Sequence, residues 1–160
     1  MKKKLCIVLA DYYEDITELL VKGATEEILQ AESKGIIKKV YGASPPDMFF
    51  HVPGVFEIPV TISKLINKYD AFVALGCIIK GETPHFDLIS KAVVNGIMDL
   101  SIKNEKPIGN GIITCLNMKQ AIERANPDKK NKGGEAVMAA LATLANFWKC
   151  IMKRFKTQEL

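Results

Sequence analysis

The sequence predicts an α/β protein in which a four-stranded parallel sheet, flanked by helices on both faces, forms a three-layer sandwich. Two observations lead to this prediction. Short apolar runs, typical of buried strands, alternate with longer segments whose apolar residues recur at spacings of three and four, which is typical of amphipathic helices. Strands that alternate with helices form a parallel sheet that is covered on both faces.

Four segments have the length and composition of strands. They are Leu5–Ala10, Ile36–Tyr41, Ala71–Ile79 and Pro107–Thr114. The first and third are continuous apolar runs, whereas Gly109 and Gly111 loosen the fourth. After the second predicted strand, the proline-containing segments Ala43–Asp47 and Val52–Gly54 predict turns.

Five helices follow from the apolar periodicity. Their ranges are Ile16–Ala31, Glu57–Tyr69, Phe86–Leu100, Met118–Arg124 and Gly134–Trp148. Gly35 fits the C-cap of the first helix. With right-handed crossovers, this order of elements favours a small doubly wound, flavodoxin-like sandwich. Residues 1–160 are expected to form one domain, and the polar tail 149–160 is expected to fray.

The bulk composition is that of a globular protein without a nucleic-acid or membrane surface. The net charge is only +4, and the lysines are not interleaved with aromatic residues, which argues against nucleic-acid binding. No segment approaches the roughly 18 apolar residues that a membrane span requires. The apolar run Leu5–Ala10 is shorter than the roughly 7–15 residues of a usual signal core, so a cytoplasmic location is expected.

The four cysteines are Cys6, Cys77, Cys115 and Cys150, and none forms a Cys-x-x-Cys pair. Their spacing supports neither a zinc site nor a disulfide framework. We therefore expect buried thiols that act as small apolar residues, and no metal site.

The segment Gly76–Asp87 carries the strongest functional signal. An apolar strand stops at a charged, glycine-containing loop, and His85 follows where the next helix begins. Thr83 can cap that helix, Pro84 suits its first position, and free N–H groups there favour a phosphate. Histidine suits proton transfer near neutral pH, and Asp87 could orient the imidazole. A purely structural histidine remains an equal alternative from the residues alone.

Other candidate residues lie at the ends of predicted elements. In Val52–Pro59, Glu57 either complements the helix dipole or faces a polyhydroxylated ligand. Arg124 either complements a helix C-terminus or binds phosphate in a bidentate manner. His51 is interpreted as a solvated loop residue. The first strand ends in Asp11-Tyr12-Tyr13-Glu14 instead of a glycine-rich phosphate loop, and the tyrosines could stack a flat heteroaromatic ring.

These residues together resemble the 6,7-dimethyl-8-ribityllumazine synthase family of riboflavin biosynthesis. The resemblance covers roughly residues 4–148 and rests on four blocks in the same order. These are Val52–Pro59, Leu75–Asp87, Pro107–Arg124 and Asn131–Gly133. It implies a transferase that condenses a ribitylamino-pyrimidinedione with dihydroxybutanone phosphate and releases phosphate and water. It also implies that no metal or organic cofactor is used.

The resemblance implies a role for each matching residue. His85 would be the catalytic proton-transfer residue. The substrate-binding residues would be Tyr12, Val55, Phe56, Glu57, Cys77, Ile78, Ile79 and Asn110, and the phosphate-binding residues Glu82, Thr83, Arg124 and Lys132. Tyr12, Tyr13, Asp11, Lys80 and Asn110 depart from residues that are common in the family. The alternative function is a non-catalytic flavin- or pterin-binding module on the same fold, for which His85 and Arg124 would be dispensable.

The resemblance also implies a homopentamer with active sites at subunit boundaries. Asn110 and Arg124 would reach in from the neighbouring chain. Some members assemble twelve pentamers into a shell, helped by an N-terminal extension that adds a strand to a neighbouring sheet, and only Met1–Lys4 precede the first predicted strand here. The short connection Ala125–Lys130 resembles shell-forming members, but we expect the isolated pentamer.

Overall fold

The computed structural model describes residues 3–33 and 48–157, with side chains as far as residue 146. Its centre is a four-stranded, entirely parallel sheet with the strand order β2-β1-β3-β4. The strands are β1 (Leu5–Ala10), β2 (Phe49–Val52), β3 (Ala71–Ile79) and β4 (Ile108–Cys115). The predicted α/β class with a four-stranded parallel sheet is confirmed.

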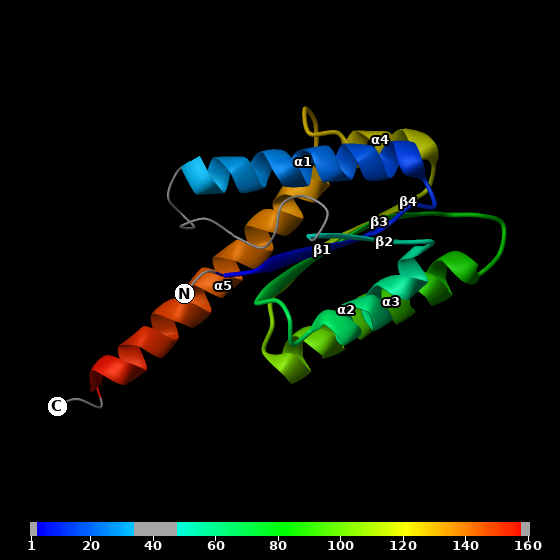
Figure 1. Cartoon of the computed structure of the whole chain (residues 1–160). Helices are drawn as coiled ribbons and strands as arrows, with labels where there is room; N and C mark the ends of the chain where they lie inside the picture. Colours follow the sequence, from blue (N-terminus) through cyan, green and yellow to red (C-terminus); the bar gives the residue numbers. More distant parts are fainter. Residues whose placement is uncertain (1–2, 34–47, 158–160) are drawn as a thin grey trace.

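Helices cover both faces of the sheet, as Figure 1 shows. They are α1 (Glu14–Ser33), α2 (Ile58–Leu65), α3 (His85–Asn104), α4 (Met118–Ala125) and α5 (Lys132–Thr157), together with the short 3-10 helix η1 (Val55–Glu57). α1, α4 and α5 lie on one face, and α2 and α3 lie on the other. The three predicted layers are therefore present.

The alternation of side chains along β3 divides the core between these two faces. Val73, Leu75 and Cys77 belong to the apolar cluster beneath α1, α4 and α5, whereas Phe72 and Ala74 belong to the cluster above α2 and α3. Residues 71–78 of β3 are all buried, as expected for a strand covered by helices on both faces. This explains why the sequence of β3 is a continuous apolar run.

Glycines allow α5 to approach both the sheet and α1 very closely. A Cβ at Gly109 of β4 would lie 2.0 Å from the Ala136 carbonyl oxygen of α5. A Cβ at Gly133 of α5 would lie 2.0 Å from the Leu20 carbonyl oxygen of α1. Asn131, with a φ of 44°, precedes α5, and its Oδ1 accepts a hydrogen bond from the Gly134 N–H at 3.1 Å. The block Asn131–Gly133 therefore lies where the start of α5 packs against α1.

The second strand of the sheet was not predicted. β2 lies at Phe49–Val52, directly before a predicted turn, and pairs with β1 from Ile7↔Phe49 to Ala10↔Val52. Its four residues are too few to show a periodicity, and Pro53 of the predicted turn follows it directly. The predicted strand Ile36–Tyr41, the turn Ala43–Asp47 and the C-cap Gly35 lie outside the described residues.

Helix boundaries differ from the prediction in three places. The predicted helix Glu57–Tyr69 is divided into η1 and α2, and α2 ends at Leu65. Pro84 is the N-cap of α3 instead of its first residue, and its side chain makes no capping hydrogen bond. α5 continues past Trp148 to Thr157. The single domain over residues 1–160 and the frayed tail stay predictions.

Candidate active site

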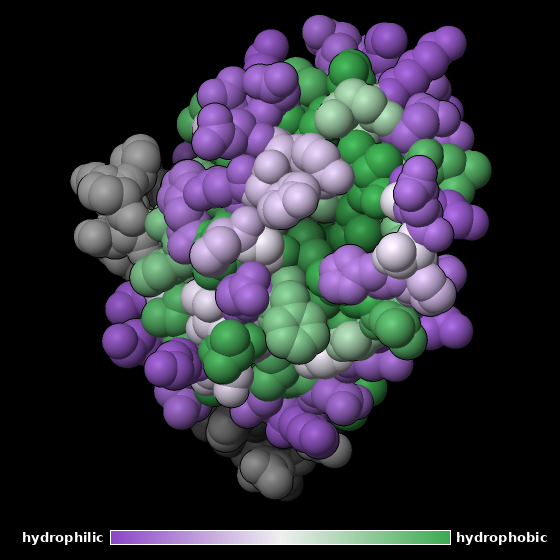
Figure 2. Space-filling model, turned by 90° about the vertical axis from the view of Figure 1, so that its right-hand side faces the viewer, coloured by the Kyte–Doolittle hydropathy of each residue, from purple (hydrophilic) through white to green (hydrophobic). Residues whose placement is uncertain are grey.

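A cleft of about 680 Å³ opens where β1, β2 and β3 end. Its volume lies within the roughly 300–1,000 Å³ typical of small-molecule sites, and the carboxyl edge of a parallel sheet is where open α/β folds bind ligands. Figure 2 views this side of the molecule, and apolar side chains gather in its middle within a polar rim. The cleft is therefore the candidate active site.

The connection from β1 to α1 supplies an aromatic wall. Tyr12 and Tyr13 both line the cleft, and their rings meet edge to face with centroids 4.9 Å apart. The Tyr12 ring is 73% exposed, whereas Tyr13 packs partly against the core. Desolvation, followed by the proximity of Tyr12 and Cys77, raises the pKa of the Tyr13 hydroxyl, so this hydroxyl stays a neutral donor.

The connection from β2 to α2 supplies a second wall. Val55, Phe56 and Glu57 form η1, and all three line the cleft together with Gly54. Val55 is buried and fixes the turn to the core, whereas Phe56 is exposed. Gly76 of β3 allows this turn to lie close, because a Cβ there would meet Val55 Cγ1 at 2.7 Å. The predicted carboxylate, Glu57, is thus carried on a turn that the core holds in place.

The floor of the cleft is the end of β3, with Cys77, Ile78 and Ile79. Burial, with smaller contributions from Cys115, raises the pKa of the Cys77 thiol to about 12. The thiol is consequently protonated near neutral pH and offers a small polarisable surface instead of a nucleophile. Cys6 and Cys115 are buried as well, which confirms the expectation for those three cysteines; the side chain of Cys150 lies outside the described ones.

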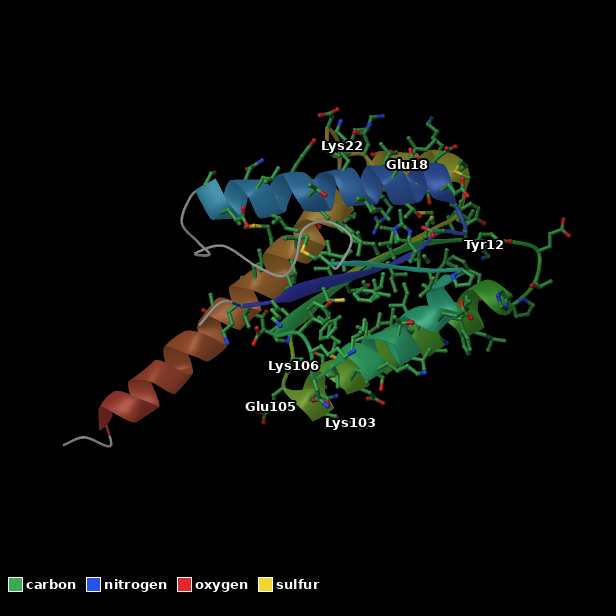
Figure 3. All side chains as sticks on the ribbon, in the orientation of Figure 1. Tyr12, Glu18, Lys22, Lys103, Glu105 and Lys106 are labelled. Atoms are coloured by element: carbon green, nitrogen blue, oxygen red, sulfur yellow. The ribbon has the colours of Figure 1, made fainter. Side chains whose placement is uncertain are left out.

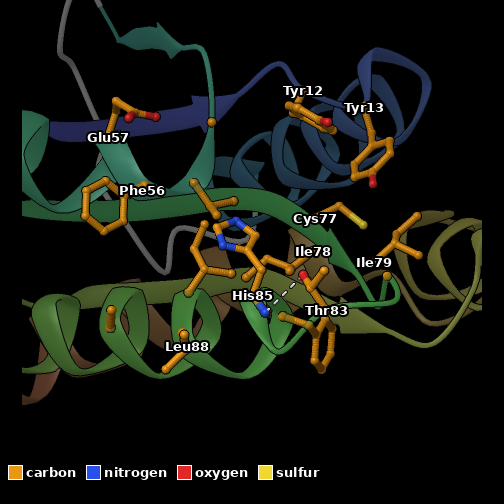
Figure 4. Close-up of a pocket in the computed structure, with 16 residues that line it drawn as sticks. Tyr12, Tyr13, Phe56, Glu57, Cys77, Ile78, Ile79, Thr83, His85 and Leu88 are labelled. Carbon is orange, nitrogen blue, oxygen red and sulfur yellow. Dashed lines mark hydrogen bonds between the residues drawn. The ribbon is translucent and has the colours of Figure 1, made fainter.

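His85 is the first residue of α3, at the rim of the cleft (Figure 4). Its backbone N–H donates to Thr83 Oγ1 at 3.4 Å, so Thr83 accepts a hydrogen bond from the first N–H of the helix, although Pro84 holds the N-cap position. Gly81 and Thr83 also line the cleft, whereas Glu82 in the same loop does not. Among the described residues, no hydrogen bond joins Asp87 to the His85 imidazole, so Asp87 does not orient the ring here.

Three other predicted site residues lie away from the cleft of their own chain. Asn110 is an exposed residue of β4, the edge strand, and its Oδ1 accepts a hydrogen bond from the Ile112 N–H at 3.0 Å. Lys132 forms an ion pair with Glu135. Arg124 lies in the last turn of α4. None of the three lines the cleft.

The surroundings of Arg124 are unusual for a surface arginine. Its Nε is buried and has no hydrogen-bond partner among the described residues. Burial raises the pKa of the neighbouring Cys115 thiol, and the positive charge of Arg124 partly opposes that rise. A buried donor without a partner is rare in folded proteins. The guanidinium group therefore has unused capacity for an anion.

The sequence analysis missed some lining residues. Tyr13 was considered for stacking but was not included among the site residues, and Phe86, Leu88, Ile89 and Ala92 of α3 also line the cleft. Leu88, Ile89 and Ala92 lie three, four and seven residues after His85, so helical periodicity could have identified these three. His51 is exposed as expected, but it lies in β2 instead of a loop.

Among the described residues there is no cluster of His, Cys, Asp and Glu that could hold a metal ion. Within the same part of the chain, no helix is long and apolar enough to cross a membrane.

Comparisons with known proteins show which family the chain belongs to. Residues 2–147 match the family described as 6,7-dimethyl-8-ribityllumazine synthase. The chain belongs to this family. A 6,7-dimethyl-8-ribityllumazine synthase of Bartonella tribocorum is 42% identical over 160 residues, which cover 97% of this chain and 95% of the relative. One of Methylorubrum extorquens is 41% identical, covering 89% of this chain and 79% of the relative.

Membership in the lumazine synthase family confirms the resemblance that the sequence suggested. The relatives are named as synthases, so the predicted enzyme class, a transferase of riboflavin biosynthesis, is confirmed as well.

Proposed function

We propose that the cleft condenses 5-amino-6-(ribitylamino)pyrimidine-2,4-dione with 3,4-dihydroxy-2-butanone 4-phosphate, giving 6,7-dimethyl-8-ribityllumazine and releasing phosphate and water. Family membership supports the reaction. The structural observation that carries the proposal is the convergence of Tyr12, Glu57 and His85, from three separate connections, on one cleft. No external oxidant or reductant is needed, so we propose that the enzyme uses no cofactor.

The pyrimidine ring is proposed to lie against Tyr12, with its ribityl chain along Val55, Phe56 and Glu57. A flat ring stacks well on an exposed aromatic face. The carboxylate of Glu57 and the backbone groups of η1 suit a polyhydroxylated chain, because they offer acceptors and donors at closely spaced positions. Cys77, Ile78 and Ile79 would bound the ring from the sheet. This arrangement accounts for every predicted ring-binding residue that lines the cleft.

His85 is proposed to transfer the protons of the condensation. The substrate amine attacks the ketone, and loss of water gives an imine; both steps move protons near neutral pH, for which imidazole is well suited. His85 lines the cleft between the turn that carries Thr83 and the apolar side of α3. Holding the two reactants together would supply much of the acceleration, since effective molarities can be worth roughly 7–11 kcal/mol.

The phosphate is proposed to lie at the N-terminus of α3, near Thr83 and Glu82. The first N–H groups of a helix and its dipole favour an anion. Arg124 and Lys132 would complete the site with positive charge and stabilise the departing phosphate. The unpartnered Nε of Arg124 supports a role in anion binding, although Arg124 lies away from the cleft of its own chain.

A neighbouring copy is therefore proposed to supply Arg124, Lys132 and Asn110. Two observations support association: none of these residues lines the cleft of its own chain, and α3 exposes the large apolar residues Leu88, Met98 and Ile102. A head-to-tail contact closes into a ring when its rotation permits. We propose a homopentamer in the cytoplasm, without further pentamers assembled around it.

The decisive experiment is turnover of both substrates by the purified chain in the presence of a chelator. We expect lumazine to appear at the same rate with and without the chelator. Binding of riboflavin without any turnover would favour the flavin-binding module instead. Activity that is lost with the chelator and restored by zinc or magnesium would contradict the cofactor-independent mechanism.

A further inference from the structure

A histidine–carboxylate pair lies just outside the cleft, at the carboxyl end of β1 and β2. His51 Nδ1 is 3.0 Å from Asp11 Oδ1 and 2.9 Å from Asp11 Oδ2. Both side chains are partly exposed, and neither lines the cleft. The proposed reaction has no use for this pair, although Asp11 directly precedes Tyr12 and His51 lies three residues before Gly54, where the second wall of the cleft begins.

The pair connects these two walls. Asp11 precedes Tyr12, and its backbone N–H donates to the Val52 carbonyl at 2.9 Å. His51 precedes Val52, from which the chain turns through Pro53 and Gly54 into η1. The side-chain contact therefore adds a second link beside the last backbone hydrogen bond between the two strands. It connects the residue before Tyr12 with the end of β2, from which the chain turns into η1.

Tyr12 has little packing of its own to hold it in place. Its ring is 73% exposed, and it meets the Tyr13 ring only edge-on. Val55, by contrast, is fixed by burial. An exposed side chain loses rotational freedom when it binds a ligand, and a backbone held in place reduces what must be ordered at that moment. The Asp11 backbone, which is hydrogen-bonded to Val52, directly precedes Tyr12 and can therefore hold the Tyr12 backbone in place.

We propose that Asp11 and His51 are positioning residues, which set Tyr12 at its working distance from η1 for the pyrimidine substrate. They act through Tyr12 and do not touch the substrate. This inference rests on the proposed function, because it assigns Tyr12 to that substrate. The competing interpretation is an ordinary surface ion pair, which contributes little to stability and nothing to binding.

The test measures both Michaelis constants in His51→Ala, Asp11→Ala and the double variant. We expect each to raise the KM of the pyrimidine about two- to fivefold, the range for an exposed ion pair. The kcat and the KM of the butanone phosphate should not change. The double variant should be no worse than either single one, since each breaks the same contact. His51→Asn, which keeps a donor near the Nδ1 position, should restore most of the affinity.

Epistasis with Tyr12 separates positioning from a general structural effect. In a Tyr12→Ala background, His51→Ala should raise the pyrimidine KM no further. Lys103→Ala is the matched control, because it removes an exposed ion pair to Asp99 at the end of α3 that lies far from Tyr12 (Figure 3). It should leave both Michaelis constants unchanged.

Three results would overturn the positioning role. They are an unchanged pyrimidine KM, an equal rise in both Michaelis constants, and effects of His51→Ala and Tyr12→Ala that simply add. A parent chain that makes no lumazine would instead reject the proposed function. The pair would then be judged by riboflavin binding alone, where fluorescence quenching should show the same two- to fivefold loss and an unchanged affinity would reject the pair.

Discussion

His85 combines a reactive side chain with a position that its backbone fixes. It is the first residue of α3, and its N–H contacts Thr83 Oγ1, so the imidazole is held at the rim of the cleft while remaining exposed. Proton transfer requires such a group within reach of the substrate, and an exposed side chain contributes little to the packing of the core. Its removal should therefore affect catalysis without affecting the fold.

We expect His85→Ala to lower kcat about ten- to a thousandfold, because general acid–base groups contribute roughly 10²–10⁴ while holding the reactants together still contributes. Steady-state kinetics near neutral pH and a thermal melt check this. The melting temperature should stay close to that of the parent. An unchanged kcat would remove His85 from the mechanism.

The buried thiols give a prediction about pH. Burial raises the pKa of Cys6 and of Cys77 to about 12, above the ordinary value of 9.0. At pH ~8 the native thiolate population should then be roughly a thousandfold below that of a free cysteine, since each pKa unit is a factor of ten. Their native alkylation should be very slow near pH 8 and should accelerate as the pH rises toward 12.

Alkylation of a Cys150→Ala variant, followed by mass spectrometry, measures this, because that variant leaves only the three buried thiols. All three should react promptly once the chain is unfolded. Fast labelling of Cys77 in the native protein would mean that the floor of the cleft is more open to solvent than the structure shows.

At the scale of elements, the contact between α1 and α5 depends on the absence of a side chain. The Cα of Gly133 lies against the backbone of Leu20, and α5 also packs on β4 through Gly109 and Ala136. α4 and α5 follow β4 in the chain, so this packing also fixes where Arg124 and Lys132 lie relative to the sheet. The small residues of α5 are therefore relevant to both stability and the site.

Gly133→Ala should destabilise the fold by about 1–3 kcal/mol or more, although alanine is favoured over glycine in helices by about 1 kcal/mol. Its Cβ would lie 2.0 Å from the Leu20 carbonyl oxygen, so α5 would have to move. Chemical denaturation measures the change in the free energy of unfolding.

Gly96→Ala in α3 is the matched control, because a Cβ there would meet only ring carbons of Pro59 at 3.3 and 3.4 Å. We expect it to change the free energy of unfolding by less than about 1 kcal/mol. Equal effects of the two substitutions would show that helix propensity, and not the approach of α1 to α5, dominates at Gly133.

At the scale of the whole molecule, the proposed phosphate-binding Arg124 lies away from the cleft, and α3 exposes large apolar side chains. The cleft holds the proposed ring-binding residues and His85, while Arg124 lies elsewhere on the same chain. Met98 and Ile102 of α3 are each more than half exposed. Large exposed apolar side chains that gather on one element commonly mark an interface. Association would complete the site and cover this surface together.

We expect the parent chain to scatter light as a particle of five chain masses, and Met98→Glu with Ile102→Glu to shift it toward the monomer with loss of activity. Two charges in a buried interface are strongly unfavourable. Leu29→Glu, which alters an exposed leucine of α1 on the opposite face, is the control and should keep the mass unchanged. A particle near sixty chain masses would instead indicate the shell.

Mixing two impaired variants tests whether sites are shared. Arg124→Ala should chiefly raise the KM of the phosphate substrate, because it removes a charge-assisted contact. If chains exchange after co-refolding, an equal mixture of His85→Ala and Arg124→Ala should regain about a quarter of the parent's sites, each with His85 from one chain and Arg124 from its neighbour. Activity of the mixture that equals the average of the separate variants would show that each chain carries its own complete site.

The sequence by itself determined the class of fold and most of the cleft. Apolar runs and helical periodicity are patterns of residues that lie close together in the chain. β1, β3, β4 and the helices could therefore be predicted from the sequence. Strand ends of a parallel sheet meet at one edge, which is why Tyr12, Glu57 and His85 could be expected together. The resemblance of four sequence blocks to a known family then predicted the family, which the comparisons confirmed.

Only the tertiary structure decided features that depend on residues far apart in the chain. β2 is a strand because β1 offers it hydrogen-bonding partners, and four residues carry no periodicity of their own. The His51–Asp11 contact, the unpartnered Nε of Arg124 and the crossing of α1 and α5 at Gly133 likewise arise between separate elements. Such contacts are set by how elements pack, and local sequence does not encode the distance between them.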